Sequence, residues 1–168
     1  MRILKIAALA VVLTLSLALV SASRMGASNE SHKAKLTGFE EVPSVSSTGT
    51  GELRLKVFED AQIIEYELTY EDLEGTTTSA SHIHLGQEGV NGGVVAFLCG
   101  GGGTPACTST SGSVTGTIGV ANIGAGAAAQ GIAAGEWLEF VRAIRAGKTY
   151  VNVHTNKHPG GEIRGQIK

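Results

Sequence analysis

Two histidines one residue apart, His82 and His84, are the residues of this sequence that first suggest chemistry. In a strand, residues i and i+2 lie on one face about 7 Å apart, so both imidazoles point the same way and Ile83 faces the core. Neutral imidazole is a common ligand of copper(II) and zinc. With His154 as a third ligand and His158, in the turn just after it, as a fourth, the sequence allows a copper or zinc site.

The same face of the protein also fits a hydrogen-bonded network without a metal. Alternation along residues 150–167 puts Asn152 and His154 on one side of a strand, and Glu162 and Arg164 on one side of the next. Arg164 can pair with Glu162, and imidazoles can donate to backbone carbonyls near glycine-rich turns. Spacing alone leaves both readings open and favours the network, because His-x-His is a weak motif by itself.

The two cysteines of the chain, Cys99 and Cys107, lie on either side of the flexible segment GGGGTPA. Two cysteines close together in an exported protein predict one disulfide. The alternatives are two free thiols or a cysteine-containing metal site, and no further soft ligand lies nearby in the sequence.

Motifs for other chemistry are incomplete. The GKT at residues 147–149 resembles a phosphate-binding loop, but Arg142 stands where that loop needs a glycine. Residues 112–116 read GSVTG, which is not a nucleophile elbow. The paired carboxylates, such as Glu40 and Glu41, are predicted to lie on solvated turns or at the start of a helix. We therefore assign no catalytic residue and do not expect an enzyme.

The N-terminus is predicted to be a secretory signal peptide covering residues 1–22. A short basic start precedes the almost entirely apolar residues 6–20, and small residues surround a cleavage site after Ala22. An uncleaved anchor is the alternative. Residues 23–32 are predicted to be a flexible leader, in which Asn29 matches the N-glycosylation pattern, although a chance match explains it as well.

The net charge of the chain and its predicted export limit the kinds of partner that the protein can bind. Loss of the two positive residues Arg2 and Lys5 with the signal peptide moves the formal charge from −2 to −4, which argues against a nucleic acid partner. We expect a secreted, cell-surface or periplasmic protein, with no membrane span after cleavage.

The elements that must position these residues are mostly strands. Apolar and polar residues alternate over 51–58 and 62–70, which predicts an antiparallel hairpin with one buried face. Further strands are predicted at 81–85, 94–98, 112–120, 150–155 and 161–167, and Asn91-Gly92 predicts a tight turn. Many short strands joined by turns indicate a β-sandwich or a small barrel.

One segment near the C-terminus departs from the strand pattern and predicts a short helix. Trp137, Phe140, Val141 and Ile144 recur at i, i+3, i+4 and i+7, and Gly147 stands where a helix commonly ends. We expect this helix to pack across one end of the strands.

Three blocks of the sequence resemble the CHRD (chordin-type) domain family: LTGFEEVPSVSSTGTG (36–51), HIHLGQEGVNGGVV (82–95) and AGKTYVNVHTNKHPGGEIRGQI (146–167). The resemblance identifies residues 33–168 as one such domain. It implies an all-β, immunoglobulin-like antiparallel β-sandwich of Greek-key type, here with the one short helix. Residues at recurrent His, Asn, Glu and Arg positions of the family are His82, His84, Asn152, His154, Glu162 and Arg164.

For function the resemblance implies less than for fold. In chordin the module belongs to an extracellular protein that binds secreted growth factors, a partner that a single exported domain need not share. We expect a non-catalytic binding or envelope module whose partner is an unknown extracellular protein or small ligand, with no certain cofactor. The alternative is a copper or zinc protein, open to redox activity, that uses His82, His84 and His154. The weaker similarity to copper/zinc superoxide dismutase is limited to the His-x-His pair.

Overall fold

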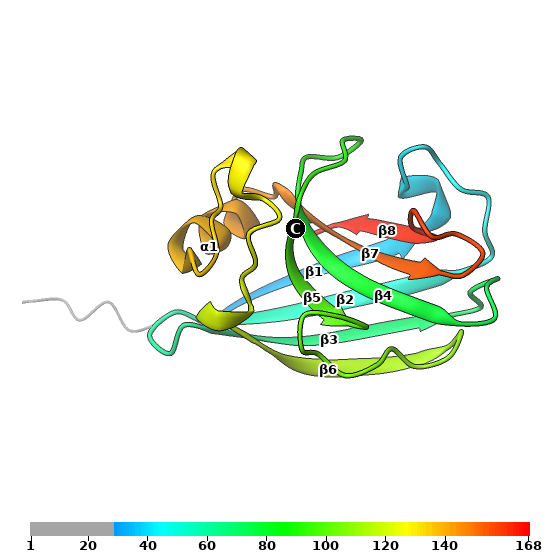
Figure 1. Cartoon of the computed structure of the whole chain (residues 1–168), viewed down its shortest axis with the longest axis horizontal. Helices are drawn as coiled ribbons and strands as arrows, with labels where there is room; N and C mark the ends of the chain where they lie inside the picture. Colours follow the sequence, from blue (N-terminus) through cyan, green and yellow to red (C-terminus); the bar gives the residue numbers. More distant parts are fainter. Residues whose placement is uncertain (1–28) are drawn as a thin grey trace, which may run out of the picture.

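The computed structural model describes residues 29–168 (Figure 1). The predicted signal peptide and the first part of the predicted leader lie outside the described residues. The described part of the chain contains eight strands and one α-helix: β1 (Glu30–Thr37), β2 (Thr50–Phe58), β3 (Ile63–Glu71), β4 (Thr78–Leu85), β5 (Val94–Cys99), β6 (Gly112–Gly119), α1 (Trp137–Arg145), β7 (Thr149–Thr155) and β8 (Ile163–Gln166). Three single-turn 3-10 helices lie between them: Gly38–Glu40, Val120–Asn122 and Ala128–Gln130. The prediction of a mostly-β chain with one short helix is confirmed.

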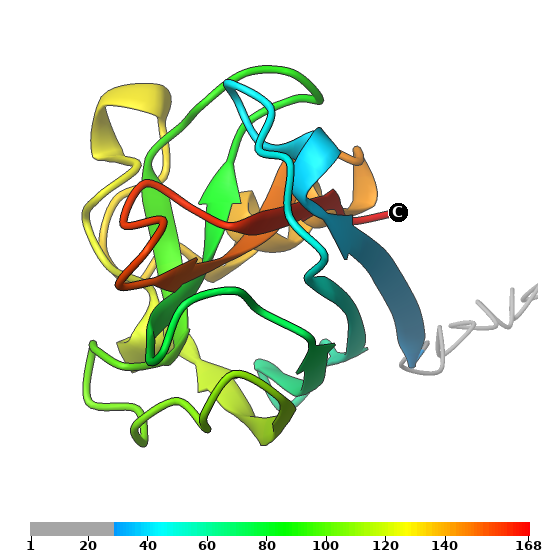
Figure 2. The same cartoon turned by 90° about the vertical axis from the view of Figure 1, so that its right-hand side faces the viewer.

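The strands form one antiparallel sheet in the order β5-β4-β7-β8-β1-β2-β3-β6. The sheet curls around a common interior (Figure 2), and its outer strands β5 and β6 contact each other. The Tyr66 hydroxyl on β3 donates to the Leu98 carbonyl on β5 at 2.7 Å and ties the two ends of the sheet together. The sheet is therefore nearly closed.

This architecture differs from the separate sheets of the expected immunoglobulin-like sandwich. The reason lies in β1, which pairs with β2 along its length and also with β8 at Thr37↔Arg164. Lys33 and Lys168 add two reciprocal backbone hydrogen bonds of 2.9 Å at the same junction. Backbone groups that pair across this junction join the strands β5-β4-β7-β8 to the strands β1-β2-β3-β6 in one sheet. Of the two architectures that the strand pattern left open, the structure is closer to the small barrel.

The predicted hairpin is confirmed as β2 and β3. Leu55 pairs with Tyr66 and Leu53 with Leu68, and all four side chains are buried in the interior. Alternation of apolar and polar residues specifies this register, because a slip of one residue would bury the charged side chains.

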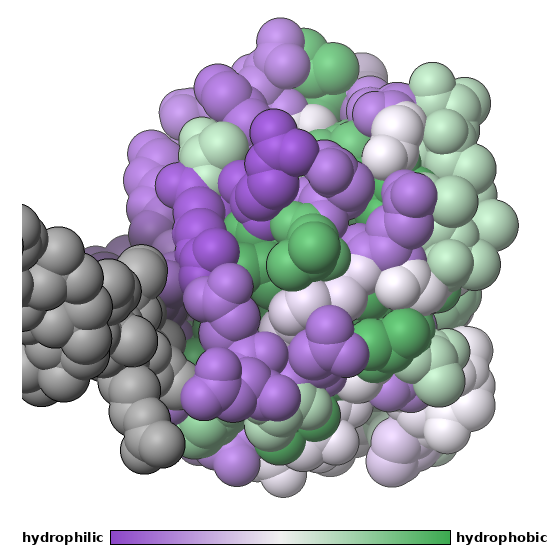
Figure 3. Space-filling model, turned by 90° about the vertical axis from the view of Figure 1, so that its left-hand side faces the viewer, coloured by the Kyte–Doolittle hydropathy of each residue, from purple (hydrophilic) through white to green (hydrophobic). Residues whose placement is uncertain are grey.

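The predicted helix is also confirmed, as α1 at one end of the sheet (Figure 1). Its buried side chains are the four predicted ones: Trp137, Phe140, Val141 and Ile144. Gly147, with φ of +63°, follows the helix as predicted. A space-filling view of this end of the molecule (Figure 3) shows hydrophilic residues with hydrophobic areas between them.

Strand β1 begins at Glu30, inside the segment that we predicted to be a flexible leader. Residues 30–32 pair with β2 in the register Glu30↔Val57 to His32↔Leu55. The Arg145 side chain of α1 also forms hydrogen bonds to the Glu30 carboxylate at 2.7–3.1 Å. Composition alone did not predict this order, because the stabilising partners come from distant segments. Among residues 29–168, no helix is long and apolar enough to cross a membrane.

Candidate functional site

The polar face predicted from alternation lies on three neighbouring strands, β4, β7 and β8. Their register pairs His82 with Asn152 and His84 with Tyr150, and Asn152 in turn with Arg164. Between these residues, Ile83, Val151 and Val153 point into the interior and are fully buried. The order β4-β7-β8 could not be read from the sequence, and it is this order that makes the face continuous.

Three of the predicted metal ligands come together on this face. The candidate ligand nitrogens of His82, His84 and His154 all lie within 4.8 Å of one another. The ring centroids of His82 and His154 are 4.8 Å apart, and those of His82 and His84 are 5.5 Å apart. We call these three residues the histidine cluster. His158 is not part of it, because it lies in the β7–β8 turn, where its amide donates to Thr155 Oγ1 at 3.2 Å.

Backbone carbonyls orient two rings of the cluster. The Nδ1 atoms of His84 and His154 lie 2.9 Å from the carbonyls of Gly92 and Pro159, respectively. On the other side of each ring, Nε2 lies 3.1 Å (His84) or 3.0 Å (His154) from Oδ1 of Asn152. Asn152 therefore joins the two imidazoles. The third ring, His82, has a buried Nδ1 with no hydrogen-bond partner among the described residues.

Burial keeps the cluster neutral. Desolvation, together with the neighbouring charges of protonated His154 and His84, lowers the pKa of His82 to about 4. Burial is also the largest cause that lowers the pKa of His84 and of His154. At neutral pH, three uncharged imidazoles therefore lie side by side, each with one unprotonated nitrogen.

Arg164 packs behind the cluster in a stack of three groups. Its guanidinium carbon lies 3.4 Å from the centroid of the Tyr150 ring, which stacks on His84 with centroids 4.6 Å apart and planes 7° from parallel. The side chain is 2% exposed and donates to Asn91 Oδ1 and to the carbonyls of Val90 and Gln87. Arg164 thus holds the loop that carries Gly92, the partner of His84. The expected tight turn at Asn91-Gly92 is instead part of this longer β4–β5 loop.

Glu162 does not join this network, and the expected pairing with Arg164 is not among the contacts of the described residues. Its carboxylate is fully buried and accepts hydrogen bonds from Ser47 Oγ, Thr155 Oγ1 and the Glu74 amide at 2.6–2.7 Å. Burial alone would raise the pKa of Glu162, but these hydrogen bonds hold it below its ordinary value. The residue stabilises the end of the sheet. Alternation did not predict this because Gly161, with φ of +128°, turns the chain just before β8.

Glu41 is a site residue that the sequence did not reveal. We predicted a solvated carboxylate, but the side chain is 6% exposed and hydrogen-bonded to Asn152. Burial raises the pKa of Glu41 to about 7, against the opposing charge of Arg164. Gly161 makes room for it, since a Cβ there would lie 2.2 Å from Glu41 Oε1. No local pattern marks this burial, because the surrounding groups come from β7, β8 and the turn between them.

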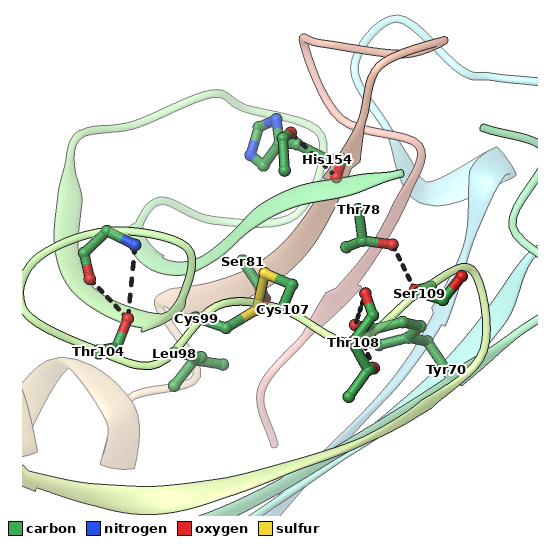
Figure 4. The surroundings of a disulfide bond; sticks show 12 residues. Tyr70, Thr78, Ser81, Leu98, Cys99, Thr104, Cys107, Thr108, Ser109 and His154 are labelled. Carbon is green, nitrogen blue, oxygen red and sulfur yellow. Dashed lines mark hydrogen bonds between the residues drawn. A yellow bond between two sulfur atoms is a disulfide. The ribbon is translucent and has the colours of Figure 1, made fainter. Parts of the chain in front are cut away.

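The predicted disulfide is confirmed between Cys99 and Cys107, whose Cα atoms are 4.9 Å apart (Figure 4). The loop that it closes covers Phe97, because Gly101 and Gly102 approach the ring so closely that a Cβ would lie 2.4 and 2.8 Å from ring atoms. Phe97 packs edge-on against His82, with centroids 4.4 Å apart. The disulfide-closed loop thus supports the third ring of the histidine cluster.

Comparison with known proteins gives one finding. The family model described as the CHRD domain matches residues 32–167, a range that contains the histidine cluster, Asn152, Arg164 and both cysteines. No curated protein and no solved structure matches the chain.

Proposed function

The chain belongs to the CHRD domain family, and from that premise we propose that it is a non-catalytic binding module whose ligand is one copper(II) or zinc ion held by His82, His84 and His154. Family membership does not itself specify a ligand, so the proposal depends on the site. Its main support is the convergence of three neutral imidazoles whose candidate ligand nitrogens lie within 4.8 Å of one another.

The Nδ1 contacts of two of the rings support this proposal. A histidine that binds a metal almost always donates its other ring N–H to a carbonyl or carboxylate, which selects the tautomer. His84 and His154 each have Nδ1 at 2.9 Å from a backbone carbonyl. With Nδ1 protonated, the Nε2 lone pairs of both rings face the Asn152 side-chain amide, which has to move aside for an ion to bind both rings.

His82 supplies the third nitrogen. Its low pKa keeps the ring unprotonated at neutral pH. Zinc–nitrogen bonds of about 2.0 Å place two ligand nitrogens about 3.3 Å apart in tetrahedral geometry, so the rings need to draw together when they bind. Three protein ligands leave one position for water or for a small molecule.

The place of action that we propose is outside the cytoplasm. The apolar N-terminal segment fits a signal peptide, and the Cys99–Cys107 disulfide suits an oxidising compartment. The module would be secreted or lie at the cell surface or in the periplasm.

One observation favours a second role for the cluster, as a structural hydrogen-bonded network. Asn152 lies between His84 and His154 and contacts Nε2 of both. In that case the same face would bind an extracellular protein or a small ligand without a metal. The two candidate roles differ in what happens when metal is added.

Titration with copper(II) in the presence of glycine as a competing chelator distinguishes them. We expect one equivalent of copper(II) to bind with sub-micromolar affinity, because three neutral imidazoles already lie on one face and copper(II) binds nitrogen ligands strongly. The absence of such binding would rule out the metal function and leave the network.

Substitutions then locate the site. His84→Ala is expected to weaken copper binding at least a hundredfold, because it removes one of three ligands. His158→Ala is the matched control: it also removes a histidine, but one outside the cluster, and it should leave the affinity unchanged. Full affinity in His84→Ala would place the metal elsewhere.

A further inference from the structure

Asn152 lies beside the two nitrogens that a metal would take. Each of these imidazoles also faces a backbone carbonyl through Nδ1, and a neutral imidazole has only one N–H to donate. If both N–H groups go to the carbonyls, both Nε2 atoms are acceptors. The Asn152 atom at 3.0–3.1 Å from both Nε2 atoms is Oδ1, which can only accept. A half-turn of the amide puts its NH₂ in the same place, and the two hydrogens of that group then satisfy both acceptors.

The other end of the same amide meets Glu41, to which Asn152 is hydrogen-bonded. When the NH₂ faces the imidazoles, the amide oxygen faces Glu41, and this contact is favourable only if the carboxyl group carries a proton to donate. When a metal holds both Nε2 atoms, the amide can turn and donate from its NH₂ to an ionised Glu41. Each state of the site therefore has its own amide orientation and its own protonation state of Glu41.

We infer that Asn152 and Glu41 couple metal binding to the release of one proton: the metal-free site holds a protonated Glu41, and the loaded site an ionised one. The inference rests on the proposed function, since it requires His84 and His154 to bind the ion. On binding, the O–H bond of Glu41 breaks and the proton leaves for solvent. Two hydrogen bonds from Asn152 to Nε2 are replaced by two metal–nitrogen bonds, and no oxidant or reductant is involved.

The surroundings of Glu41 agree with both states. Its Oε1 is buried and has no hydrogen-bond partner among the described residues, which is costly for an ion and tolerable for a neutral carboxyl group. The charged and titratable groups that face Glu41 are Arg164 on β8 and Tyr150 on β7. With a pKa of about 7, a small gain of positive charge nearby is enough to ionise the carboxyl group.

Calorimetric titration with zinc chloride, in buffers of different ionisation enthalpy, counts the protons. At pH 6 the wild-type protein is expected to release close to one proton for each zinc ion bound. Its affinity should be about tenfold higher at pH 8 than at pH 6, as follows from one proton lost from a group with a pKa of about 7. Zinc binding without proton release would overturn the inference.

Glu41→Gln assigns the proton, because a carboxamide does not ionise. This variant should still bind zinc, with proton release near zero and an affinity that does not change between pH 6 and pH 8. Glu40→Gln, the exposed neighbour, is the matched control and should behave like the wild type. If Glu41→Gln released as many protons as the wild type, the histidines would be the source and the inference would be wrong.

A second variant tests the coupling even if Glu41→Gln does not fold. Asn152→Ala removes the amide that links Glu41 to the rings, so its zinc binding should also lose the proton release, and retained release would contradict the coupling. If the wild-type protein bound no zinc, the proposed function would fail together with this inference. If the protein bound zinc but released no proton that depends on Glu41, this inference would fail and the proposed function would stand.

Discussion

At the scale of single residues, Glu41 and Glu162 show that the surroundings of a buried carboxylate decide its charge. Both side chains are almost fully buried. Glu162 accepts three hydrogen bonds, and its pKa is lowered despite burial. Glu41 has one oxygen without a partner, and burial raises its pKa to about 7. The first residue therefore suits a structural role, and the second suits the exchange of a proton.

Glu162→Gln is expected to destabilise the protein by about 2 kcal/mol at pH 7, because an NH₂ group replaces one oxygen that accepts hydrogen bonds from buried donors. Since the folded-state pKa of Glu162 lies below its ordinary value of 4.5, the stabilisation from ionised Glu162 is complete above that value. It is lost as pH falls through the lowered pKa. Urea unfolding from pH 7 down to pH 3 measures this.

The matched control for Glu162 is Glu71→Gln, on an exposed side chain. Its free energy of unfolding should change by less than about 0.5 kcal/mol. An equal effect of both substitutions would show that the hydrogen bonds of Glu162 contribute no net stability.

At the scale of elements, the histidine cluster is positioned by two strands and supported by three loops. β4 carries His82 and His84, and β7 carries His154. The loops contribute the Gly92 carbonyl, the Pro159 carbonyl and the disulfide-closed cover over Phe97. Rigid strands thus determine which residues meet, and the loops determine how the rings are turned.

Replacing both cysteines, Cys99→Ser with Cys107→Ser, should lower the free energy of unfolding by about 2.5 kcal/mol, because the disulfide closes a short loop. It should also weaken copper binding severalfold, since Phe97 loses the cover that holds it against His82. Unfolding in denaturant and chelator competition measure the two effects.

Gly101→Ala is the informative companion to the double cysteine variant. It keeps the disulfide but places a Cβ 2.4 Å from the Phe97 ring, so it should weaken copper binding with a smaller loss of stability. Unchanged copper affinity in both variants would show that the loop does not support His82.

At the scale of the whole molecule, the curled sheet brings its two ends together across the interior, where one hydrogen bond links them. The tie is the hydrogen bond from Tyr66 on β3 to the Leu98 carbonyl on β5. The hydroxyl fits because a glycine, Gly116, lies against it, and a Cβ there would lie 2.5 Å away. The curl keeps β4 and β7 packed over the interior, with the histidine cluster on their outer side.

Tyr66→Phe is expected to cost about 1–2 kcal/mol of stability, because the buried Leu98 carbonyl loses its donor. Hydrogen exchange should become faster in β5 and stay unchanged in β1 and β2, which pair independently of this tie. Tyr70→Phe is the control, as its hydroxyl bonds to Thr108 in a partly exposed place. Equal exchange rates in β5 of Tyr66→Phe and wild type would show that the tie does not hold the edge.

Local patterns in the sequence determined the hairpin, the helix, the pairing of the two cysteines and the side of each strand on which a histidine lies. These features depend on residues within a few positions of one another, where a period of two or of 3.6 expresses burial directly. The three family blocks also sufficed to identify the CHRD domain.

The tertiary structure alone decided the closure of the sheet, the adjacency of β4, β7 and β8, the burial of Glu41 and the separation of Glu162 from Arg164. Most of these depend on pairings between segments far apart in the chain, such as His82 with Asn152 and Thr37 with Arg164. Alternation assigns a face to each residue but not a neighbour to each strand. The histidine cluster forms because its three residues share a face and their two strands are also neighbours.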